Sequence, residues 1–349
     1  MDKSALEELV KGGEIIDKRS FAELDLTGID LRGAIFEKVD LRGAKLDGAK
    51  LQEAVFVGCD FSGASLAGAS MPHGTFSGCK LVDAKLDGLS APIGRFLECD
   101  LTGASFAGAG LLATSIVKSN LTKVTFAGAN LDRAQLMLGR FEDASFAGAQ
   151  VKQTVLYEAD LRRTTLTGTR YELCIFNKAN LDGLDLSEMD MTLCQFQDGS
   201  LRGVRFVGAK LEQCNFKSAE LAGAVFDGAI CVRAMFAQAN AQKASFKKSS
   251  LREALFAEAR IEECDFSEAD AQGAVFIGAR AASAKFVRAN LTHAQLTSAD
   301  VSGADFSGAS LTLARLHNLK DDGATFGPSK LLALGTDEDM AQAERWKAP

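Results

Sequence analysis

Large apolar side chains recur along this chain every five residues. All 23 phenylalanines, from Phe21 to Phe326, lie at residue numbers that leave remainder one on division by five, and leucine fills most remaining positions of this register. No insertion or deletion disturbs the register between Phe21 and Leu316, which gives sixty consecutive units. A period of five fits neither an amphipathic helix nor an alternating strand. The pattern therefore predicts a chain that turns a corner once per unit, which makes a solenoid.

The positions around each large residue, here called the centre, differ in character. Two residues before the centre lies a small residue, and alanine fills this position without a break from Ala269 to Ala309. Between them falls a polar residue such as Asp160, and the second residue after the centre is frequently glycine, as at Gly28. Side chains two apart on an extended backbone point the same way, so the small residue and the centre face the interior. Glycine suits a corner that needs positive φ. Each unit is predicted to be a short strand followed by a tight turn.

This pattern resembles the pentapeptide-repeat family, whose motif is A(D/N)LXX. The resemblance covers residues 21–316, which is most of the chain. It implies an all-β solenoid: a right-handed quadrilateral parallel β-helix with four units per coil. Sixty units then make fifteen coils, with short α-helical segments at the two ends.

A second period, of twenty residues, supports four units per coil. One column of phenylalanine centres runs from Phe36 to Phe96 and resumes from Phe176 to Phe276, and a second column runs from Phe206 to Phe306. Four undersized centres fall in the other two columns: Cys231, Ala241, Ala271 and Ala281. Large groups on two sides and smaller groups on the others compensate for volume in a close-packed interior.

The register divides the chain into three parts. Residues 1–20 are predicted to hold a capping helix and a lead-in, because Ser4-Ala5-Leu6-Glu7 has the form of a capping box. Residues 21–326 form the repeat β-helix, and residues 327–349 form a C-terminal cap or tail with a helix from Thr336 onward.

The C-terminal part carries apolar residues of its own. We expect three leucines to seal the last coil: Leu331, Leu332 and Leu334. Trp346, the only tryptophan, is a candidate anchor that either holds the tail against the coil or belongs to a docking peptide.

The cysteines follow the repeat register, which argues against a disulfide or metal framework. Two groups occupy the small inward position at spacings of twenty residues: Cys59, Cys79 and Cys99, then Cys174, Cys194 and Cys214. Parallel stacked side chains have poor disulfide geometry, and three thiols in a line do not make a tetrahedral zinc site. We expect buried free thiols, with no metal and no cofactor.

Residues with catalytic chemistry are few and dispersed. The three histidines, His73, His293 and His317, all fall at outward positions and are expected to be solvated. A catalytic site in so uniform an array would be expected to interrupt the register, and no interruption exists. The sequence therefore predicts a protein that is not an enzyme.

Charge and hydropathy place few restrictions on location. The net charge is −7, and no apolar run approaches the length of a membrane span. The first residues lack the basic and apolar segments of a secretory signal. We expect a cytoplasmic protein without membrane contact, although export without a signal peptide stays open.

One basic stretch, residues 243–252, invites a nucleic-acid interpretation that the coil register removes. At a spacing of twenty residues, Lys243 lies beside Glu263, Lys248 beside Glu268, and Arg233 beside Glu253. These are predicted to be ion pairs between coils, so no direct nucleic-acid binding is expected.

One side of the predicted coil is apolar on its outer surface. Outward positions flank the centres of the column from Phe36 to Phe276, and on the other sides the position before the centre is mostly polar. The apolar face comprises Ile35, Val55, Val57, Leu97, Val117, Met137, Val155, Tyr157, Ile175, Met235, Leu255, Val275 and Ile277. Exposed apolar residues gathered on one side indicate a protein partner or self-association as a homodimer.

Three functions follow from these observations and the resemblance. The first is a non-catalytic protein-interaction scaffold or adaptor, since some bacterial family members accompany secretion or effector systems. The second is a DNA-mimicking protein that binds and protects a topoisomerase (gyrase), as the quinolone-resistance members do. The polar position before the centre carries thirteen acidic and thirteen basic residues, a balance unlike a duplex, whose phosphates all have one sign. The third is an effector that acts through its C-terminal tail.

Overall fold

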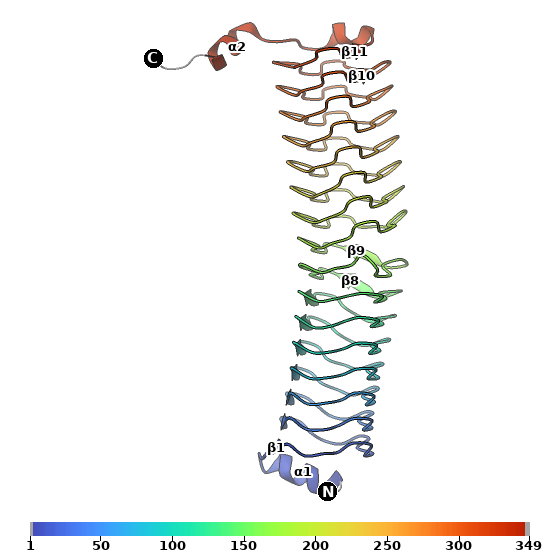
Figure 1. Cartoon of the computed structure of the whole chain (residues 1–349), viewed down its shortest axis with the longest axis vertical. Coiled ribbons are helices and arrows are strands. Elements are labelled where there is room, and N and C mark those ends of the chain that lie inside the picture. Colours follow the sequence, from blue (N-terminus) through green and yellow to red (C-terminus); the bar gives the residue numbers. More distant parts are fainter. Residues whose placement is uncertain (1–2, 346–349) are drawn as a thin grey trace. The chain divides into compact units, whose positions relative to one another are not determined.

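A computed structural model describes residues 3–345 and confirms a parallel β-solenoid, of about 16 turns. The chain divides into two compact units, Met1–Ala179 and Asn180–Pro349, and each is described by itself. Within each unit, paired residues are twenty apart, as in the bridges Asp40↔Asp60 and Asp185↔Arg205. This spacing confirms four five-residue units per coil (Figure 1).

Unit 1 opens with helix α1 (Lys3–Lys11) and a seven-stranded parallel sheet in sequence order. The strands are β1 (Ile15–Asp17), β2 (Ile35–Glu37), β3 (Val55–Val57), β4 (Thr75–Ser77), β5 (Arg95–Leu97), β6 (Ser115–Val117) and β7 (Gln135–Met137). A second pair, β8 (Gln150–Lys152) and β9 (Arg170–Glu172), lies on a neighbouring side. The sheet begins with β1, ahead of the first phenylalanine at Phe21.

Unit 2 has the same coils with fewer extended strands. It contains β10 (Asp305–Phe306), β11 (Thr325–Phe326), the 3-10 helix η1 (Pro328–Leu332) and helix α2 (Glu338–Arg345). Single parallel bridges join its remaining coils, such as Met235↔Leu255.

The core of each unit is a column of stacked aromatic rings. In unit 2, the Phe216 and Phe236 rings stack with centroids 5.0 Å apart, and Phe226 and Phe246 stack at 4.7 Å on the opposite side. The two ladders meet edge to face, since the Phe226 and Phe236 planes lie at 90° with centroids 5.6 Å apart. The predicted phenylalanine columns are confirmed, and this contact explains why the smaller centres lie on the other two sides.

Nearly every corner among the described residues places its second residue after the centre at positive φ. Gly28 has φ 66°, and non-glycine residues adopt the same conformation, such as Ile93 at 58°. The polar residue before the centre stabilises the turn, because its side chain accepts the N–H two residues later. Asp300, for example, accepts the Ser302 N–H at 3.0 Å. This contact gives a physical reason for Asp or Asn in the motif.

The cysteines occupy the interior, and all eight are buried and free. Cys79 Sγ donates to the Phe56 carbonyl of the preceding coil at 3.3 Å, and threonine does the same from the small position at Thr114, whose Oγ1 donates to Ala91 O at 2.7 Å. Burial raises the pKa of the Cys214 thiol above its ordinary value. The predicted placement of the cysteines is confirmed.

The start of unit 1 is closed by α1. Leu6 is fully buried, and Glu7 Oε1 accepts the Asp30 N–H at 3.0 Å. The capping-box prediction is wrong, because Ser4 already lies inside the helix that begins at Lys3. Glu7 therefore reaches the first coil instead of its own helix terminus.

The end of unit 2 differs from the prediction. Leu331, Leu332 and Leu334 are 90%, 58% and 50% exposed, so the expectation that they seal the last coil is wrong. Lys330 covers the end of the aromatic ladder instead: its Nζ lies 3.9 Å from the Phe326 ring centroid and 2.7 Å from Asp321.

Candidate interaction surfaces

The apolar face lies on the side of unit 1 that carries β1 to β7. The register pairs Ile35 with Val55 and Val117 with Met137, and Val155 pairs with Ile175 in the last coils of the unit. In unit 2, the same column brings Met235 beside Leu255 and Leu255 beside Val275. Within each unit, the structure therefore places neighbouring predicted residues in successive coils.

Exposure of these side chains varies. Five are more than one-third exposed: Ile35 39%, Val57 41%, Met235 36%, Leu255 36% and Ile277 39%. The others are half-buried: Val55, Leu97, Val117, Met137, Val155, Tyr157, Ile175 and Val275. Ile15, in β1, is 54% exposed and continues the column. It precedes Phe21, where the repeat register begins, so the register does not predict it.

Polar residues divide the apolar face into patches. Arg95 and Gln135 interrupt the column in unit 1, and Gln195 and Asn215 precede Met235 in unit 2. Apolar corner residues next to this side enlarge the unit 1 surface. They are Ile93, Leu112, Leu138 and Leu173, each more than one-third exposed.

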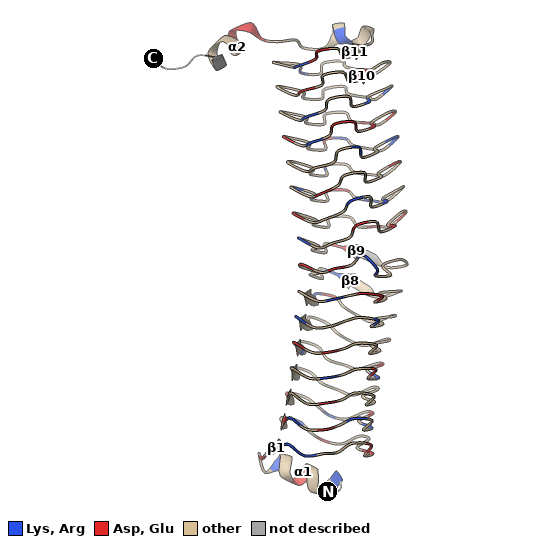
Figure 2. Cartoon of the chain, in the orientation of Figure 1, with Lys and Arg blue, Asp and Glu red and all other residues tan. Residues whose placement is uncertain are grey.

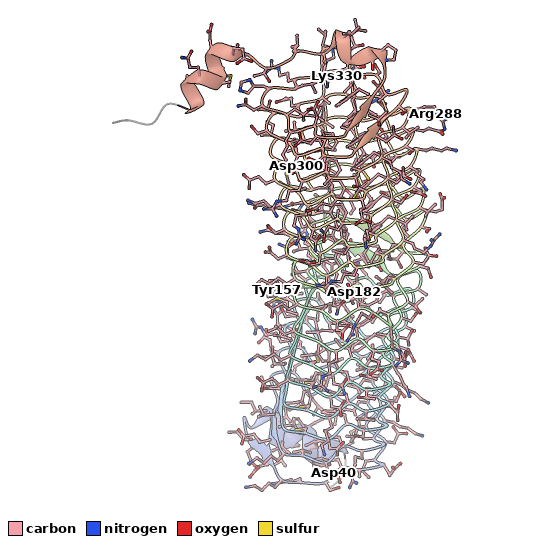
Figure 3. The ribbon with its side chains drawn as sticks, turned by 45° about the horizontal axis from the view of Figure 1, so that its top comes forward. Asp40, Tyr157, Asp182, Arg288, Asp300 and Lys330 are labelled. Carbon is pink, nitrogen blue, oxygen red and sulfur yellow. The ribbon has the colours of Figure 1, made fainter. Side chains whose placement is uncertain are left out.

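Tyr157 has the most specific surroundings on the apolar face. The Lys178 Nζ lies 5.4 Å from its ring centroid and 3.5 Å from Glu158, and these two neighbours raise the Lys178 pKa. Val155 and Ile175, on the same side of these coils, pair with one another. Figure 3 labels Tyr157 on the outer surface of its coil. An aromatic ring with a polar tip and a neighbouring cation is typical of the residues that dominate protein interfaces.

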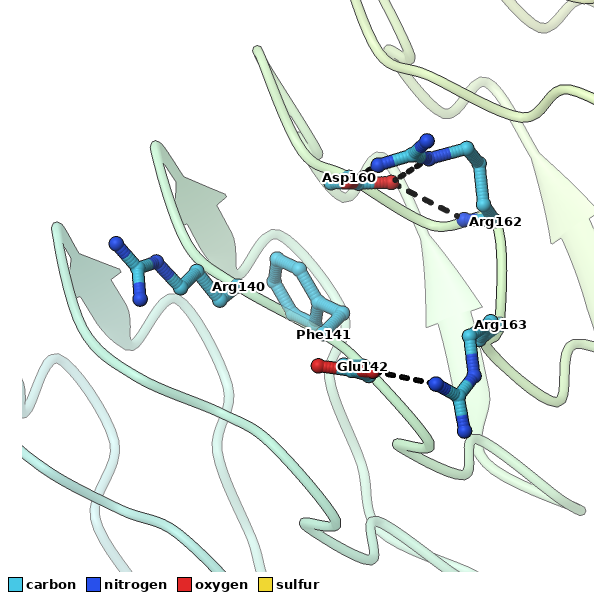
Figure 4. A pocket seen from close by; sticks show the side chains of 6 residues that line it. All are labelled: Arg140, Phe141, Glu142, Asp160, Arg162 and Arg163. Atoms are coloured by element: carbon cyan, nitrogen blue, oxygen red, sulfur yellow. Dashed lines mark hydrogen bonds and ion pairs between the residues drawn. The ribbon is translucent and has the colours of Figure 1, made fainter.

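A cleft of about 400 Å³ opens elsewhere in unit 1, between the coils that carry Phe141 and Asp160 (Figure 4). Preceding coils are joined here by bonds such as Leu121 N–H to Arg140 O, at 2.8 Å. Arg140 and Asp160 still form a parallel bridge between these two coils, but within residues 3–345 the N–H groups of Phe141 and Asp143 make no comparably close bond to the next coil. The two coils are therefore less closely joined on this side.

Charged side chains line the cleft, and most of them form ion pairs with one another. Arg162 Nε donates to Asp160 at 2.9 Å, which lowers the Asp160 pKa, and Arg163 pairs with Asp143 at 2.9 Å. Arg163 also pairs with Glu142. Three arginines and two carboxylates line the cleft, so its lining carries a small excess of positive charge.

Ion pairs between coils balance the remaining surface charge. The three predicted pairs are confirmed: Arg233–Glu253 at 2.7 Å, Lys243–Glu263 at 3.9 Å and Lys248–Glu268 at 3.9 Å. Figure 2 shows basic and acidic residues interspersed along the coils of both units. Among the residues that the structure describes, neither unit gathers charges of a single sign on one side.

The histidines do not share one environment. His73 and His293 are exposed, as predicted. The prediction for His317 is wrong, because it is only 7% exposed and its Nδ1 accepts the Asp337 N–H at 3.2 Å. The tail folds back over it, a contact that the repeat register does not encode. Trp346, the predicted tail anchor, lies outside the described residues.

The described residues offer neither a metal site nor a membrane-spanning helix. In the described range 3–345, no three His, Cys, Asp or Glu side chains are grouped to hold a metal ion. No helix in that range is long and apolar enough to cross a bilayer.

The family model for pentapeptide repeats matches eight stretches, some of them overlapping, that together cover more than half of the chain. They are residues 25–63, 45–88, 140–170, 174–213, 214–252, 249–286, 274–312 and 289–320. The chain belongs to the pentapeptide-repeat family. A comparison with curated proteins finds no match.

Solved structures of other family members are similar to the chain. QnrB1, a plasmid-mediated fluoroquinolone resistance protein, is 21% identical over 57% of this chain and 94% of its own, with a TM-score of 0.38. HetL, involved in heterocyst differentiation regulation in the cyanobacterium Nostoc sp. strain PCC 7120, is 21% identical over 90% and 96%, with a TM-score of 0.24. Rfr23 from the cyanobacterium Cyanothece 51142 is 21% identical over 36% and 90%, with a TM-score of 0.22. These likenesses concern the fold alone.

Proposed function

We propose that this protein is a non-catalytic scaffold that binds a protein partner through the apolar face. The observation that carries the proposal is the enrichment of outward apolar side chains on one side of the coils within each unit. Ile35, Val57, Met235, Leu255 and Ile277 are all more than one-third exposed on that side. Apolar surface gathered in this way on a soluble fold is typical of a binding site.

Two features support a protein as the partner. The patches are flat, because they lie on parallel strands in register, and a flat surface suits another protein better than a small molecule. Tyr157, on the same side as the paired Val155 and Ile175, supplies an aromatic anchor beside the cation of Lys178. Residues of this kind carry most of the binding energy in protein interfaces.

The balance of charge disfavours a DNA-mimicking role. Basic residues pair with acidic ones along the coils, as in Arg288–Glu268 and Lys320–Asp300. A surface that imitated a duplex would carry unpaired negative charge along its length. Topoisomerase binding is therefore an alternative that the test below distinguishes from the proposal.

The test is affinity capture from the cells that naturally make the protein. The bait is the full-length chain, compared with a variant carrying Ile175→Asp, Leu255→Asp and Val275→Asp. We expect the face variant to lose the partner by more than tenfold, because each carboxylate would be buried without a partner in the interface.

A matched control uses apolar outward residues on other sides. Val225→Asp and Ile230→Asp introduce two carboxylates into unit 2 away from the apolar face, as Leu255→Asp and Val275→Asp do on it, and are expected to retain the partner. A chain truncated after residue 335 tests the tail. Loss of the partner only on truncation would contradict binding through the apolar face and favour an effector tail. Co-purification of topoisomerase subunits would favour the DNA-mimic hypothesis.

A further inference from the structure

Arg95 is the only charged residue among the outward positions that precede the centres on the apolar side of unit 1. It lies in β5, and its side chain is exposed. The other residues at this position carry no charge: Ile15, Ile35, Val55, Thr75, Ser115, Gln135, Val155 and Ile175. A single cation therefore interrupts a column that is otherwise apolar or uncharged.

Apolar residues surround Arg95 on its own coil and on the next. The neighbouring outward residues of its own coil are Ile93, which is 46% exposed, and the half-buried Leu97. On the next coil, Ser115 is its register partner, and the oxygen of Leu112, which is 42% exposed, accepts the Ile93 N–H at 2.9 Å. We call this surface the Arg95 patch, and it consists of Ile93, Arg95, Leu97, Leu112, Ser115 and Val117.

The acidic residue nearest to Arg95 in the sequence already has a partner. On the coil of Arg95 and the two coils beside it, the only carboxylate on this side is that of Glu98, whose Oε1 lies 3.6 Å from Lys118 Nζ. The next acidic residues on this side, Glu53 and Asp132, are two coils away. Among the described residues, Arg95 forms no ion pair. Two cations and one carboxylate leave these three coils with one excess positive charge on this side.

A partner that covers the Arg95 patch must satisfy the guanidinium. Apolar groups alone would remove water from Arg95 and leave its charge unpaired, which is strongly unfavourable. A carboxylate can accept two parallel hydrogen bonds from a guanidinium, and such pairs are among the stronger ones in proteins. Apolar side chains on either side of that carboxylate would contact Ile93 and Leu112. The patch is therefore complementary to an acidic residue that lies between apolar ones.

We propose, on the basis of the scaffold function proposed above, that the Arg95 patch binds a protein segment that presents an aspartate or a glutamate between apolar side chains. Charge complementarity supports this choice of partner, since an unpaired cation within apolar surface favours a segment of opposite charge over a neutral or basic one. The apolar residues supply contact area, and Arg95 supplies specificity.

Random peptides displayed on phage are a suitable probe, because such a library contains acidic, neutral and basic segments in the same apolar contexts. Immobilised full-length protein is compared with its Arg95→Glu and Arg95→Met variants, and the bound pools are sequenced. We expect wild type to enrich peptides with Asp or Glu between apolar residues. Arg95→Glu should enrich Lys or Arg at that place, and Arg95→Met should enrich apolar peptides without a charge preference.

Lys85→Glu is the matched control, because it makes the same change of charge on the opposite side of the same coil. It should select the same peptides as wild type, and circular dichroism verifies that every variant keeps its coils. The affinity of a peptide selected by wild type is then measured by fluorescence polarisation. It should fall by about tenfold or more on Arg95→Glu and should decrease with added salt. Replacing the acidic residue of the peptide by its amide should weaken binding to wild type but not to Arg95→Met.

A variant with Ile93→Asp and Leu112→Asp separates the partner chemistry from the function that it rests on. Peptides that bind this variant as well as wild type, or a pool with no enriched sequence, would contradict both proposals for unit 1. Peptides that this variant loses, but that show no acidic preference or bind Arg95→Glu equally well, would overturn the partner chemistry alone. Light scattering tests a second copy as the occupant: a dimer that is lost in Arg95→Glu would also overturn the proposal.

Discussion

At the corners of the coils, the backbone conformation conflicts with the presence of a side chain. Nearly every described corner has positive φ, which glycine adopts without cost and which costs other L-residues about 1–2 kcal/mol. Many corners nevertheless carry residues such as Glu53, Lys123 and Leu138, with φ between 58° and 60°. The conflict is sharpest at Ile93, a β-branched residue with φ 58°.

Replacing Ile93 by glycine should therefore stabilise the protein. The gain from relieved strain is partly offset by the greater freedom of glycine in the unfolded chain, so we expect about 0.5–1 kcal/mol. Urea unfolding followed by circular dichroism measures the change. The reverse control is Gly68→Ala, at φ 64° with no atom within 4 Å of the added Cβ, which should cost about 1 kcal/mol through the backbone alone. A glycine variant less stable than wild type would show that the Ile93 side chain contributes more than its backbone strain costs.

Residues inside the repeat could be predicted because five-residue spacing determines which way each side chain points. Cys79 and Phe236 occupy the interior positions that the register assigns to them. His317 could not be predicted in this way. Its burial arises from a tail that lies outside the repeat, and periodicity says nothing about where a non-periodic segment folds back.

At the scale of elements, the start of unit 1 and the end of unit 2 are covered in different ways. Helix α1 buries Leu6 against the first coil, an apolar contact that its amphipathic pattern predicts. The last coil is covered by Lys330 of η1, while the leucines around it stay exposed. Their hydrophobic side chains made the leucines the expected cover of the last coil. The turn of η1 instead directs the lysine over the Phe326 ring, where a cation–π contact is available.

We therefore expect Lys330→Met to destabilise unit 2 although it adds an apolar residue. Methionine keeps the length of the side chain but loses the contact with Phe326 and the ion pair with Asp321, for a cost of about 1 kcal/mol. Leu331→Ser, at a residue that is 90% exposed, should change the free energy of unfolding by less than about 0.5 kcal/mol. Thermal and urea unfolding of both variants measure the difference. A larger loss from Leu331→Ser would restore the leucine-cap hypothesis.

At the scale of the whole molecule, the regular repeat predicts the fold well but predicts the candidate site only in part. The period of twenty predicts which residues share the apolar face, and within each unit the bridges place them in adjacent coils. It does not predict how far each protrudes, because Val55 is half-buried while Val57, two residues later on the same strand, is 41% exposed. Nor does it predict the cleft beside Phe141, where coils in perfect sequence register are less closely bonded.

The repeated aspartates make stability sensitive to acid. Bonds from Lys320 and Ser302 lower the pKa of Asp300 to about 2 from an ordinary value of 3.8, and those from Ser187 and Ser307 lower the pKa of Asp185 and Asp305. A carboxylate whose pKa is lower in the folded state contributes stability that is present above its unfolded pKa and is lost as the pH falls through the folded pKa. The free energy of unfolding should thus hold steady above about pH 5 and decline from about pH 4 to pH 2.

Asp300→Asn tests the contribution of a single repeat. The amide still accepts the Ser302 N–H, but it does not titrate and loses the ion pair with Lys320. After allowance for solvent screening, the variant should be less stable than wild type by about 0.5 kcal/mol at pH 7 and equal to it near pH 2. Urea unfolding across this pH range measures the convergence. Asp339→Asn, on α2 outside the coils, serves as the control. Curves that stay parallel down to pH 2 would mean that stacked carboxylates do not determine the acid limit of this solenoid.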